Sequence, residues 1–258
     1  MKTSPTQLEN KEQGLSGDVP CSLDLSELDV VYTVRLGDNN EELKCSVRSL
    51  VNLPHRNVWM AGYLPSWTRG VYHLTTYKVS MNKVCNTDHN WVQVAMNREI
   101  SEPFILMNDD FFVMKPVDCL PSRYVSTHEA FLKRYQRLHP FSYYTKVIQN
   151  TTNKLKELGI EKALCYELHT PMIIYKKDIL QAMQNHNYRA CPVNIRSLAG
   201  NVGKYGGKQA KDVKVYDVNE RLDDYMGNDF ISTQDISFNG QIGNYIRNKF
   251  KEKSDYER

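Results

Sequence analysis

An apolar run extends from Phe104 to Met114 and is interrupted by the polar triplet Asn108-Asp109-Asp110. A continuous apolar run of this kind predicts a strand that is buried on both faces of a sheet. In an open α/β sheet, ligands bind at the carboxyl ends of the strands, so we expect the triplet at a ligand-binding edge. Two adjacent carboxylates at such a place are costly unless another group neutralises them.

Hydrophobic periodicity predicts further elements on both sides of this strand. The β-branched residues at 30–34 predict a first strand, and apolar residues on one face of 41–50 predict a helix after it. The other expected elements are strands at 57–62, 72–76 and 171–175, and helices at 88–98, 130–138, 143–158, 177–185 and 236–250. This order predicts an α/β fold with a mixed, mostly parallel sheet flanked by helices, followed by a helical and loop-rich C-terminal part.

The 258 residues suffice for one large α/β domain with a substantial core. Residues 1–27 are polar and lack periodicity, which predicts a flexible N-terminal tail or a loosely docked arm. We expect a single domain at 28–250, with a change of pattern after Pro116, and a charged tail at 251–258.

Composition limits the functional classes. The hydrophobic content of 41% and the net charge of +3 are ordinary for a soluble protein, and the charge alone does not indicate a polyanionic partner. No apolar run approaches the roughly 20 residues of a membrane span, and no signal peptide opens the chain. The six cysteines are irregularly spaced, which predicts free thiols and a reducing, cytoplasmic compartment. Neither a Gly-x-Gly-x-x-Gly nor a Gly-Lys-Ser/Thr motif is present, which disfavours dehydrogenases and P-loop enzymes.

The acidic triplet has two interpretations. Asn-Asp and Asp-Asp pairs are ordinary components of surface turns. A divalent cation with oxygen ligands, Mg²⁺ or Mn²⁺, is the usual means of neutralising paired carboxylates beside substrate phosphates. The bulky apolar flanks disfavour a solvated turn, but the residues alone leave both interpretations open.

An ordered set of short motifs gives the triplet a context. The set comprises Asp29–Thr33, Arg48–Leu50, Pro65–Trp67, Asn86, the Asn-Asp-Asp-x-Phe block at 108–112 and His169-Thr170-Pro171. In this order, over residues 28–180, it resembles the Stealth family of sugar-phosphate transferases and related glycosyltransferase-A-type enzymes. The chain departs from the family at the first strand, where Arg35 follows Thr33-Val34 in place of Trp-Val-Asp. The departure bears on phosphotransferase chemistry more than on the nucleotide-sugar fold.

The resemblance implies a glycosyltransferase-A-like (Rossmann-like) domain with a nucleotide-sugar half at 28–121 and an acceptor half at 122–250. It implies a UDP-sugar as donor and a divalent metal, Mn²⁺ or Mg²⁺, with Asn108-Asp109-Asp110 standing in for the Asp-x-Asp motif. The expected metal ligands are Asp110, Asp109 and His169. The expected substrate-binding residues are Thr33, Val34, Arg35, Lys83, Asn86, Asn108, Asp109, Lys204 and Lys208.

An inverting transfer needs a carboxylate base at the acceptor, whereas a retaining transfer does not need it in the same way. Asp235 is the first candidate for this base and Asp88 the second. Asp235 also fits the N-cap of the expected helix at 236–250.

A Gly-rich and Lys-rich stretch at 200–208 lies in an expected loop at 188–214. Such a loop can close over a diphosphate, follow a nucleic-acid backbone, or simply be an exposed hairpin. The basic faces of the helices at 130–138 and 143–158 are typical of solvated surface.

Three functions therefore compete. The preferred one is a metal-dependent glycosyltransferase that acts on a saccharide or on a modified base in DNA. The second is transfer of a sugar-1-phosphate to a saccharide. The third is a non-enzymatic nucleic-acid-binding protein in which the acidic triplet is structural.

Overall fold

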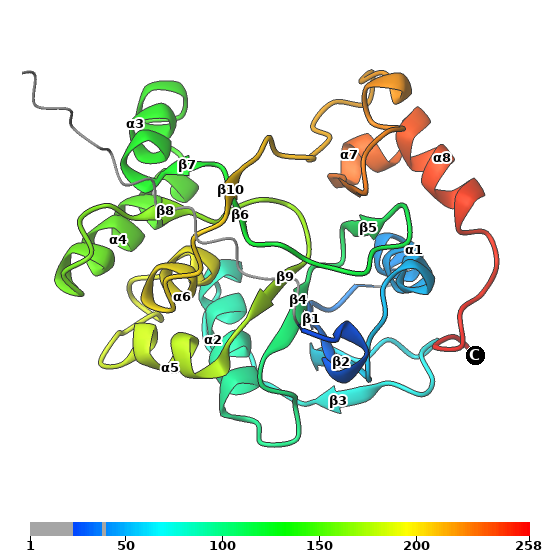
Figure 1. The fold of residues 1–258 in the computed structure, drawn as a ribbon, viewed down its shortest axis with the longest axis horizontal. Helices are drawn as coiled ribbons and strands as arrows, with labels where there is room; N and C mark the ends of the chain where they lie inside the picture. Colours follow the sequence, from blue (N-terminus) through cyan, green and yellow to red (C-terminus); the bar gives the residue numbers. More distant parts are fainter. Residues whose placement is uncertain (1–22, 38–39) are drawn as a thin grey trace, which may run out of the picture.

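The computed structural model describes residues 23–37 and 40–258. Its central sheet has five strands in the order β3 (Tyr72–Leu74), β2 (Val58–Gly62), β1 (Val30–Val34), β4 (Phe104–Met107) and β9 (Met172–Ile174). The first four strands are parallel, and β9 is antiparallel to β4 (Figure 1). The predicted α/β class with a mostly parallel sheet is confirmed, and the arrangement is compatible with a Rossmann-like fold.

Helices cover both faces of this sheet, because side chains along each strand alternate between two apolar clusters. Val30, Tyr32 and Val34 pack on the face covered by helix α1 (Glu41–Ser49). Val31 lies on the opposite face. That face is covered by α2 (Lys83–Met96), α5 (Lys176–Met183) and α6 (Ile195–Val202). Figure 1 shows these helices beside the sheet.

The remaining elements extend this core on its two sides. Helices α3 (His128–Leu138) and α4 (Tyr143–Glu157) form a hairpin with its own apolar cluster. Strand β5 (Phe111–Val113) pairs with β11 (Phe230–Ser232) and packs on α7 (Asp235–Phe238) and α8 (Gln241–Lys249). The short pieces are β6 (Arg123–Tyr124), β7 (Ser126–Thr127), β8 (Leu164–Cys165), β10 (Lys208–Gln209) and the 3₁₀ helices η1 (Leu25–Glu27), η2 (Leu50–Asn52) and η3 (Leu222–Asp224).

The carboxylate of Asp29 holds the amino-terminal edge of the sheet together. It is fully buried and accepts hydrogen bonds from Arg56 Nε at 2.9 Å, Asn57 Nδ2 at 3.1 Å and Trp59 Nε1 at 3.1 Å. The backbone N–H of Ser101 donates to the same carboxylate at 2.9 Å. Asp29 itself directly precedes β1. Three of its partners lie in β2 or just before it, and Ser101 lies just before β4. One buried anion therefore fixes the mutual position of three parallel strands.

Two helical segments differ from the sequence prediction. Residues 195–202, expected within a loop, form α6, whose Gly200 allows close packing: a Cβ there would lie 2.6 Å from the ring of Tyr166. The expected helix at 236–250 is divided into α7 and α8 at Gly240, where a Cβ would lie 2.4 Å from the Val218 carbonyl oxygen. The first prediction takes glycine as a sign of a loop, and the second ignores the glycine inside the expected helix. The effect of each glycine depends on its neighbour in the folded structure, which the local sequence does not show.

Both ends of the described chain pack against the domain. In the expected N-terminal tail, residues 1–22 lie outside the described residues, whereas Leu25 is buried in the core. The charged segment 251–258 is docked: Glu257 forms a bidentate ion pair with Arg48 at 2.7 and 2.8 Å, and the Arg258 N–H donates to the Trp67 carbonyl at 2.8 Å.

The structure also bears on the expected compartment. Cys119 is disulfide-bonded, so the expectation of free thiols is wrong at this position. Cys45, Cys85, Cys165 and Cys191 are free. In the described ranges, no helix is both long enough and apolar enough to cross a membrane. A cytoplasmic location stays a prediction.

The Asp29 network generates the first prediction. Burial raises the pKa of Asp29, but hydrogen bonds from Arg56, Ser101 and Asn57, with the Arg56 charge, outweigh burial and hold this pKa below its usual value. The ionised carboxylate therefore stabilises the fold above the unfolded-state pKa of about 3.9, and this contribution is lost as the pH falls through the lower folded-state pKa. We expect Asp29→Asn to lower the free energy of unfolding at pH 7 by about 2–3 kcal/mol.

Urea denaturation of both proteins at several pH values measures this difference, which should shrink below about pH 3. The matched control is Glu27→Gln, an exposed carboxylate two residues earlier, which should leave the unfolding midpoint unchanged. Equal effects of the two substitutions would contradict the role assigned to Asp29.

Candidate functional site

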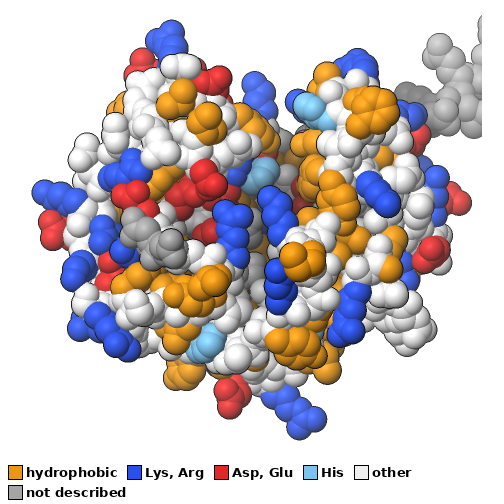
Figure 2. Space-filling view, turned by 180° about the vertical axis from the view of Figure 1, so that it is seen from behind, with side chains coloured by type: hydrophobic (Ala, Val, Ile, Leu, Met, Phe, Trp, Pro, Cys, Tyr) orange, Lys and Arg blue, Asp and Glu red, His pale blue; other side chains and the backbone are white. Residues whose placement is uncertain are grey.

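The acidic triplet lies at the carboxyl ends of the parallel strands, as the pattern predicts. Residues Asn108, Asp109 and Asp110 form the turn between β4 and β5, and the Phe111 N–H donates to the Asn108 carbonyl at 3.2 Å. Because β5 pairs antiparallel with β11, the segment around Ser232 is brought beside this turn. Figure 2 shows acidic side chains gathered in a hollow of the surface, with Lys and Arg side chains beside them.

Asp110 is bound on one side only. Its Oδ2 atom forms an ion pair with Lys214 Nζ and accepts a hydrogen bond from Ser232 Oγ at 3.2 Å. Lys214 also donates to the Thr233 carbonyl, so the cation is held by the C-terminal half of the chain. The Oδ1 atom of Asp110 is buried and has no hydrogen-bond partner in the described part of the chain. A buried carboxylate oxygen without a partner is unfavourable and marks a position where a cation or donor can bind.

Two further carboxylates sense this charge. Burial and the neighbouring Asp110 raise the pKa of Asp109 to about 6, although Arg35 and Lys214 act in the opposite direction. Burial also raises the pKa of Glu42 to about 7; a hydrogen bond from Thr233 opposes this rise, and the charges of Asp110 and Asp109 add to it. The Glu42 side chain enters the cluster from the first turn of α1. The site therefore holds more negative charge than its own cations neutralise.

Asp235 lies at the rim of this cluster. Its Oδ1 atom is 3.9 Å from Arg35 Nη2, and both side chains are mostly exposed. Its charge is also among those that raise the pKa of Glu42. The N-cap alternative for Asp235 is wrong, because Gln234 occupies the N-cap of α7 and its backbone N–H donates to Ser237 Oγ at 2.8 Å. The carboxylate of Asp235 is thus left facing solvent beside the end of β1.

His169 precedes β9 and is oriented by a carboxylate. Its Nδ1 atom lies 2.7 Å from Asp212 Oδ2, and its backbone N–H donates to Asp212 Oδ1 at 2.9 Å. The ring meets the Phe111 ring edge-on, with centroids 6.1 Å apart. An imidazole that donates Nδ1–H to a carboxylate leaves Nε2 as an acceptor, which is how carboxylates commonly prepare a histidine for a metal or a proton.

Of the other expected substrate-binding residues, three lie at the end of β1 and Lys83 lies on helix α2. Thr33 is half-buried, Val34 is buried and Arg35 is exposed at the carboxyl end of β1, the edge that also carries the triplet. Lys83 is exposed in the first turn of α2.

Three predictions need correction. Asn86 is a structural residue: its side chain accepts from the N–H groups of Val79 and Ser80 at 2.9 and 3.0 Å and donates to the Ser80 carbonyl. Asp88 is 2% exposed, with its carboxylate accepting from the Val193 N–H at 2.9 Å, and burial raises its pKa well above the usual value. We therefore remove both from the candidate site, Asp88 as a base and Asn86 as a substrate contact.

The expected Gly-rich loop is the third correction. Residues 200–202 belong to α6, Lys204 follows in the turn after it, and Lys208 lies in β10, which pairs with β6. A Cβ at Gly207 would lie 2.1 Å from the Ser122 carbonyl oxygen, so this stretch is packed against the segment before β6. The stretch is therefore part helix and part strand, and not one continuous loop.

The residues of the cluster fit a cation that is held by two carboxylates together with substrate phosphates. Among residues 23–37 and 40–258, no three His, Cys, Asp or Glu side chains are grouped closely enough to hold a metal by themselves. Mg²⁺ and similar ions are, however, often held by only one or two carboxylates together with substrate phosphates. The free Oδ1 of Asp110 and the raised pKa of Asp109 agree with such a two-carboxylate site. His169 as a third ligand stays a prediction.

Sequence reasoning missed Glu42, Lys214 and Asp212. A glutamate in the first turn of a helix is ordinary, and Lys214 is one of several lysines in its stretch. No local pattern distinguishes them, because they become part of the site only through the tertiary pairing of β5 with β11 and the bridge between Lys214 and Ser232.

The raised pKa of Glu42 generates a prediction with an internal control. A carboxyl whose folded-state pKa is above its unfolded value of about 4.3 contributes stability at low pH that is lost as the pH rises through the folded-state pKa. Glu42→Gln should therefore raise the free energy of unfolding at pH 8 by about 1 kcal/mol, a figure reduced for solvent screening, and should leave it nearly unchanged at pH 4.

The neighbouring Glu41 is the matched control. A hydrogen bond from Arg247 lowers the pKa of Glu41, so Glu41→Gln should destabilise the protein at pH 8 by about 0.5–1 kcal/mol. Urea denaturation at pH 8 and pH 4 compares the two. If both substitutions shift the midpoint in the same direction at pH 8, the excess of negative charge at the cluster is disproved.

The comparison with known proteins adds no family to this geometry. Neither a protein-family model nor a curated protein sequence matches the chain.

Proposed function

We propose that this protein is a metal-dependent glycosyltransferase that transfers a sugar from a nucleotide-sugar donor, a UDP-sugar, to an acceptor. The observation that carries the proposal is that the buried Oδ1 atom of Asp110 has no hydrogen-bond partner in the described chain. Its charge also helps to raise the pKa values of two neighbouring carboxyls, Asp109 and Glu42. This arrangement sits at the carboxyl edge of a parallel sheet, where α/β proteins bind nucleotides. The strand order, four parallel strands and one antiparallel neighbour of β4, is compatible with a glycosyltransferase-A-like domain.

Asp110 and Asp109 would hold Mn²⁺ or Mg²⁺ on the diphosphate of the donor. The bound metal supplies charge neutralisation for the leaving group. Lys214 is the protein's own cation at Asp110 and adds positive charge at the same place. Asn108 completes the turn that presents these carboxylates. His169, held by Asp212, faces the same region across Phe111 and is the proposed third contact to metal or phosphate.

The donor nucleotide and the acceptor would enter from the rim. Thr33, Val34 and Arg35 end β1 at the proposed nucleotide edge. Asp235, exposed and 3.9 Å from Arg35, is the carboxylate available to deprotonate an acceptor hydroxyl in an inverting transfer. We propose a saccharide or a modified base in DNA as the acceptor. Transfer of a sugar-1-phosphate would use the same donor but break the phosphoanhydride bond, so analysis of the products separates the two reactions.

Donor binding can be tested before any acceptor is known. A ligand that binds only the folded state raises the melting temperature, by roughly 5–10 °C for a chain of this size at 100 times its dissociation constant. We expect one nucleotide sugar of a panel, a UDP-sugar, to give such a rise with Mn²⁺ and little rise with EDTA. Absence of a shift with every donor in the presence of Mn²⁺ would reject the proposal and make DNA the next ligand to test.

Asp110→Asn tests the site assignment. The substitution removes the charge that the metal requires, so we expect the Mn²⁺-dependent shift to disappear and donor hydrolysis or transfer to fall by about 100-fold or more. The control is Asp118→Asn, an exposed aspartate in the segment after β5, which should retain both properties. Metal-dependent turnover at the wild-type rate in Asp110→Asn would show that the metal is held elsewhere.

A further inference from the structure

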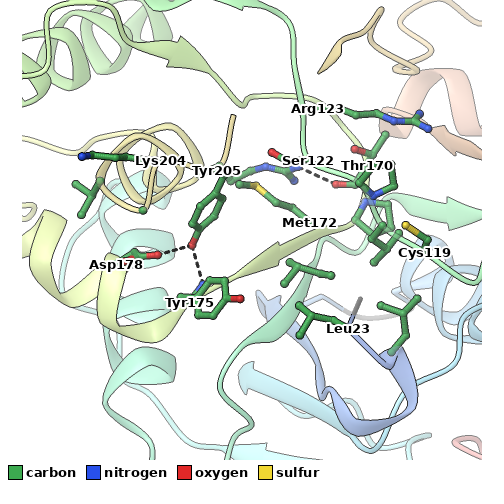
Figure 3. Close-up of a pocket in the computed structure, with 18 of the residues that line it drawn as sticks. Leu23, Cys119, Ser122, Arg123, Thr170, Met172, Tyr175, Asp178, Lys204 and Tyr205 are labelled. Atoms are coloured by element: carbon green, nitrogen blue, oxygen red, sulfur yellow. Dashed lines mark hydrogen bonds between the residues drawn. The ribbon is translucent and has the colours of Figure 1, made fainter. Parts of the chain in front are cut away.

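A second cavity lies along the free edge of the central sheet. It has a volume of about 480 Å³ and is bounded by strand β9, the segment 119–123 and the turn that follows α6. Figure 3 shows Tyr205 inside it, with its hydroxyl bonded to Asp178 and to the backbone of Tyr175. The volume lies in the range of small-molecule binding sites, about 300–1,000 Å³.

Within residues 23–37 and 40–258, the wall formed by β9 presents a peptide group that has no hydrogen-bond partner. The backbone N–H of Ile105 donates to the backbone carbonyl of Asp29, on the side of β1. The peptide groups of Ile105 therefore do not pair with β9, and the hydrogen bonds from β4 to β9 are made by the residues on either side of Ile105. Ile105 is opposite Ile173, and the N–H and C=O of an antiparallel residue point to the same side. Those of Ile173 therefore face away from β4, into the cavity. The N–H of Tyr175, two residues later, points the same way and is satisfied by the Tyr205 hydroxyl at 2.8 Å.

A buried guanidinium supplies a second unsatisfied donor. Arg196 is held by α6: its Nε donates to the Tyr166 carbonyl at 3.1 Å and its Nη2 to the Thr170 carbonyl at 2.8 Å. Its Nη1 atom is buried and has no partner among the described residues. Arg196 and Thr170 both line the cavity. A buried charged donor that is fixed on two sides and unpartnered on the third can bind an anion.

The charges around the cavity have one predominant sign. Arg123, Lys177 and Lys204 line it together with Arg196. Among the described lining residues the only carboxylate is Asp178, and this group already accepts the Tyr205 hydroxyl at 2.9 Å. Glu167 and Asp212 also lie near Arg196, but Glu167 accepts from Ser197 and Asp212 from His169.

The turn that carries Lys204 has an unusual backbone. Lys204 has φ of 55°, a conformation that costs energy in a residue other than glycine. The preceding Gly203 makes room for its neighbours, because a Cβ there would lie 2.2 Å from the Tyr205 ring. This strained turn thus places a lysine among the residues that line the cavity.

We propose that this cavity binds a small molecule that carries an oxyanion, either a carboxylate or a phosphate group. The anionic group accepts hydrogen bonds from Arg196 Nη1 and the Ile173 N–H, and Lys204 adds charge at the entrance. Neither Asp109 nor Asp110 lines this cavity, so the site is distinct from the acidic cluster. The two adjoin one another, because the Arg196 guanidinium lies 5.6 Å from the ring centroid of Phe111, the residue that directly follows the acidic triplet. The inference concerns binding alone and does not depend on the proposed transferase activity.

The experiment is a thermal and calorimetric titration of the full chain with two probes, inorganic phosphate and malonate, in the absence of metal. We expect saturable binding of at least one probe below about 10 mM. Arg196→Lys keeps the charge but removes the open Nη1 donor, and should weaken binding about tenfold. The probe that binds more tightly identifies the ligand as a phosphate or a carboxylate.

Lys204→Gly guards against a folding artefact, because glycine suits a positive φ while the substitution removes the charge. It should retain the fold and weaken binding about threefold. Lys251→Gln, an exposed lysine in the C-terminal segment, removes the same charge elsewhere and should bind like the wild type. Absence of saturable binding of both probes, or identical affinities in all four proteins, would overturn the proposal.

Discussion

The ion pair between Lys214 and Asp110 joins residues that are 104 positions apart in the chain. It is needed because β4 delivers two carboxylates to the half-buried turn into β5, which is flanked by apolar clusters. Leaving such an anion unpaired is costly, so the C-terminal half has to bring a cation and hydroxyl donors to it. The pairing of β11 with β5 accomplishes this, since it places Ser232 beside Asp110. The C-terminal half is thus attached to the sheet by the electrostatic requirement of the turn as well as by apolar packing.

One lysine does not complete the neutralisation. Burial first, and the charges of neighbouring carboxylates second, raise the pKa of Asp109 to about 6 and that of Glu42 to about 7. The cavity at β9 has the opposite character: Arg196 has a donor without a partner in the described chain, and Asp178 is the one carboxylate among the described lining residues. Phe111 contacts both sides, through its stacking with Arg196 and its edge contact with His169. Two neighbouring sites of opposite sign suit a protein that binds one ligand through a cation and another through an oxyanion.

The sequence predicts the fold well because the signals of its strands are local. Four of the five strands of the central sheet coincide with an apolar run, the exception being the edge strand β3, and the acidic triplet lies at the strand end where the pattern placed it. The misjudged elements depend on distant partners: Gly200 is tolerated in α6 because it packs on Tyr166, and Gly240 divides the last helix because it meets Val218. The same reason explains the site. Asp109 and Asp110 are recognisable from their flanks, whereas Glu42 and Lys214 acquire their role only when separate segments meet.

The motif at Asp29–Thr33 shows why a resemblance has to be interpreted through geometry. The two ends of one strand lie at opposite edges of the sheet, so the residues of a single motif serve different purposes. Asp29, fully buried among Arg56, Asn57 and Trp59, positions the strands and does not reach the ligand-binding edge. Thr33 and the following Arg35 are at the edge that carries Asp109. A departure from the family pattern at Arg35 therefore changes the charge of the proposed donor site, because Arg35 lowers the pKa of Asp109 and pairs with Asp235. The packing that Asp29 maintains at the opposite edge is unaffected.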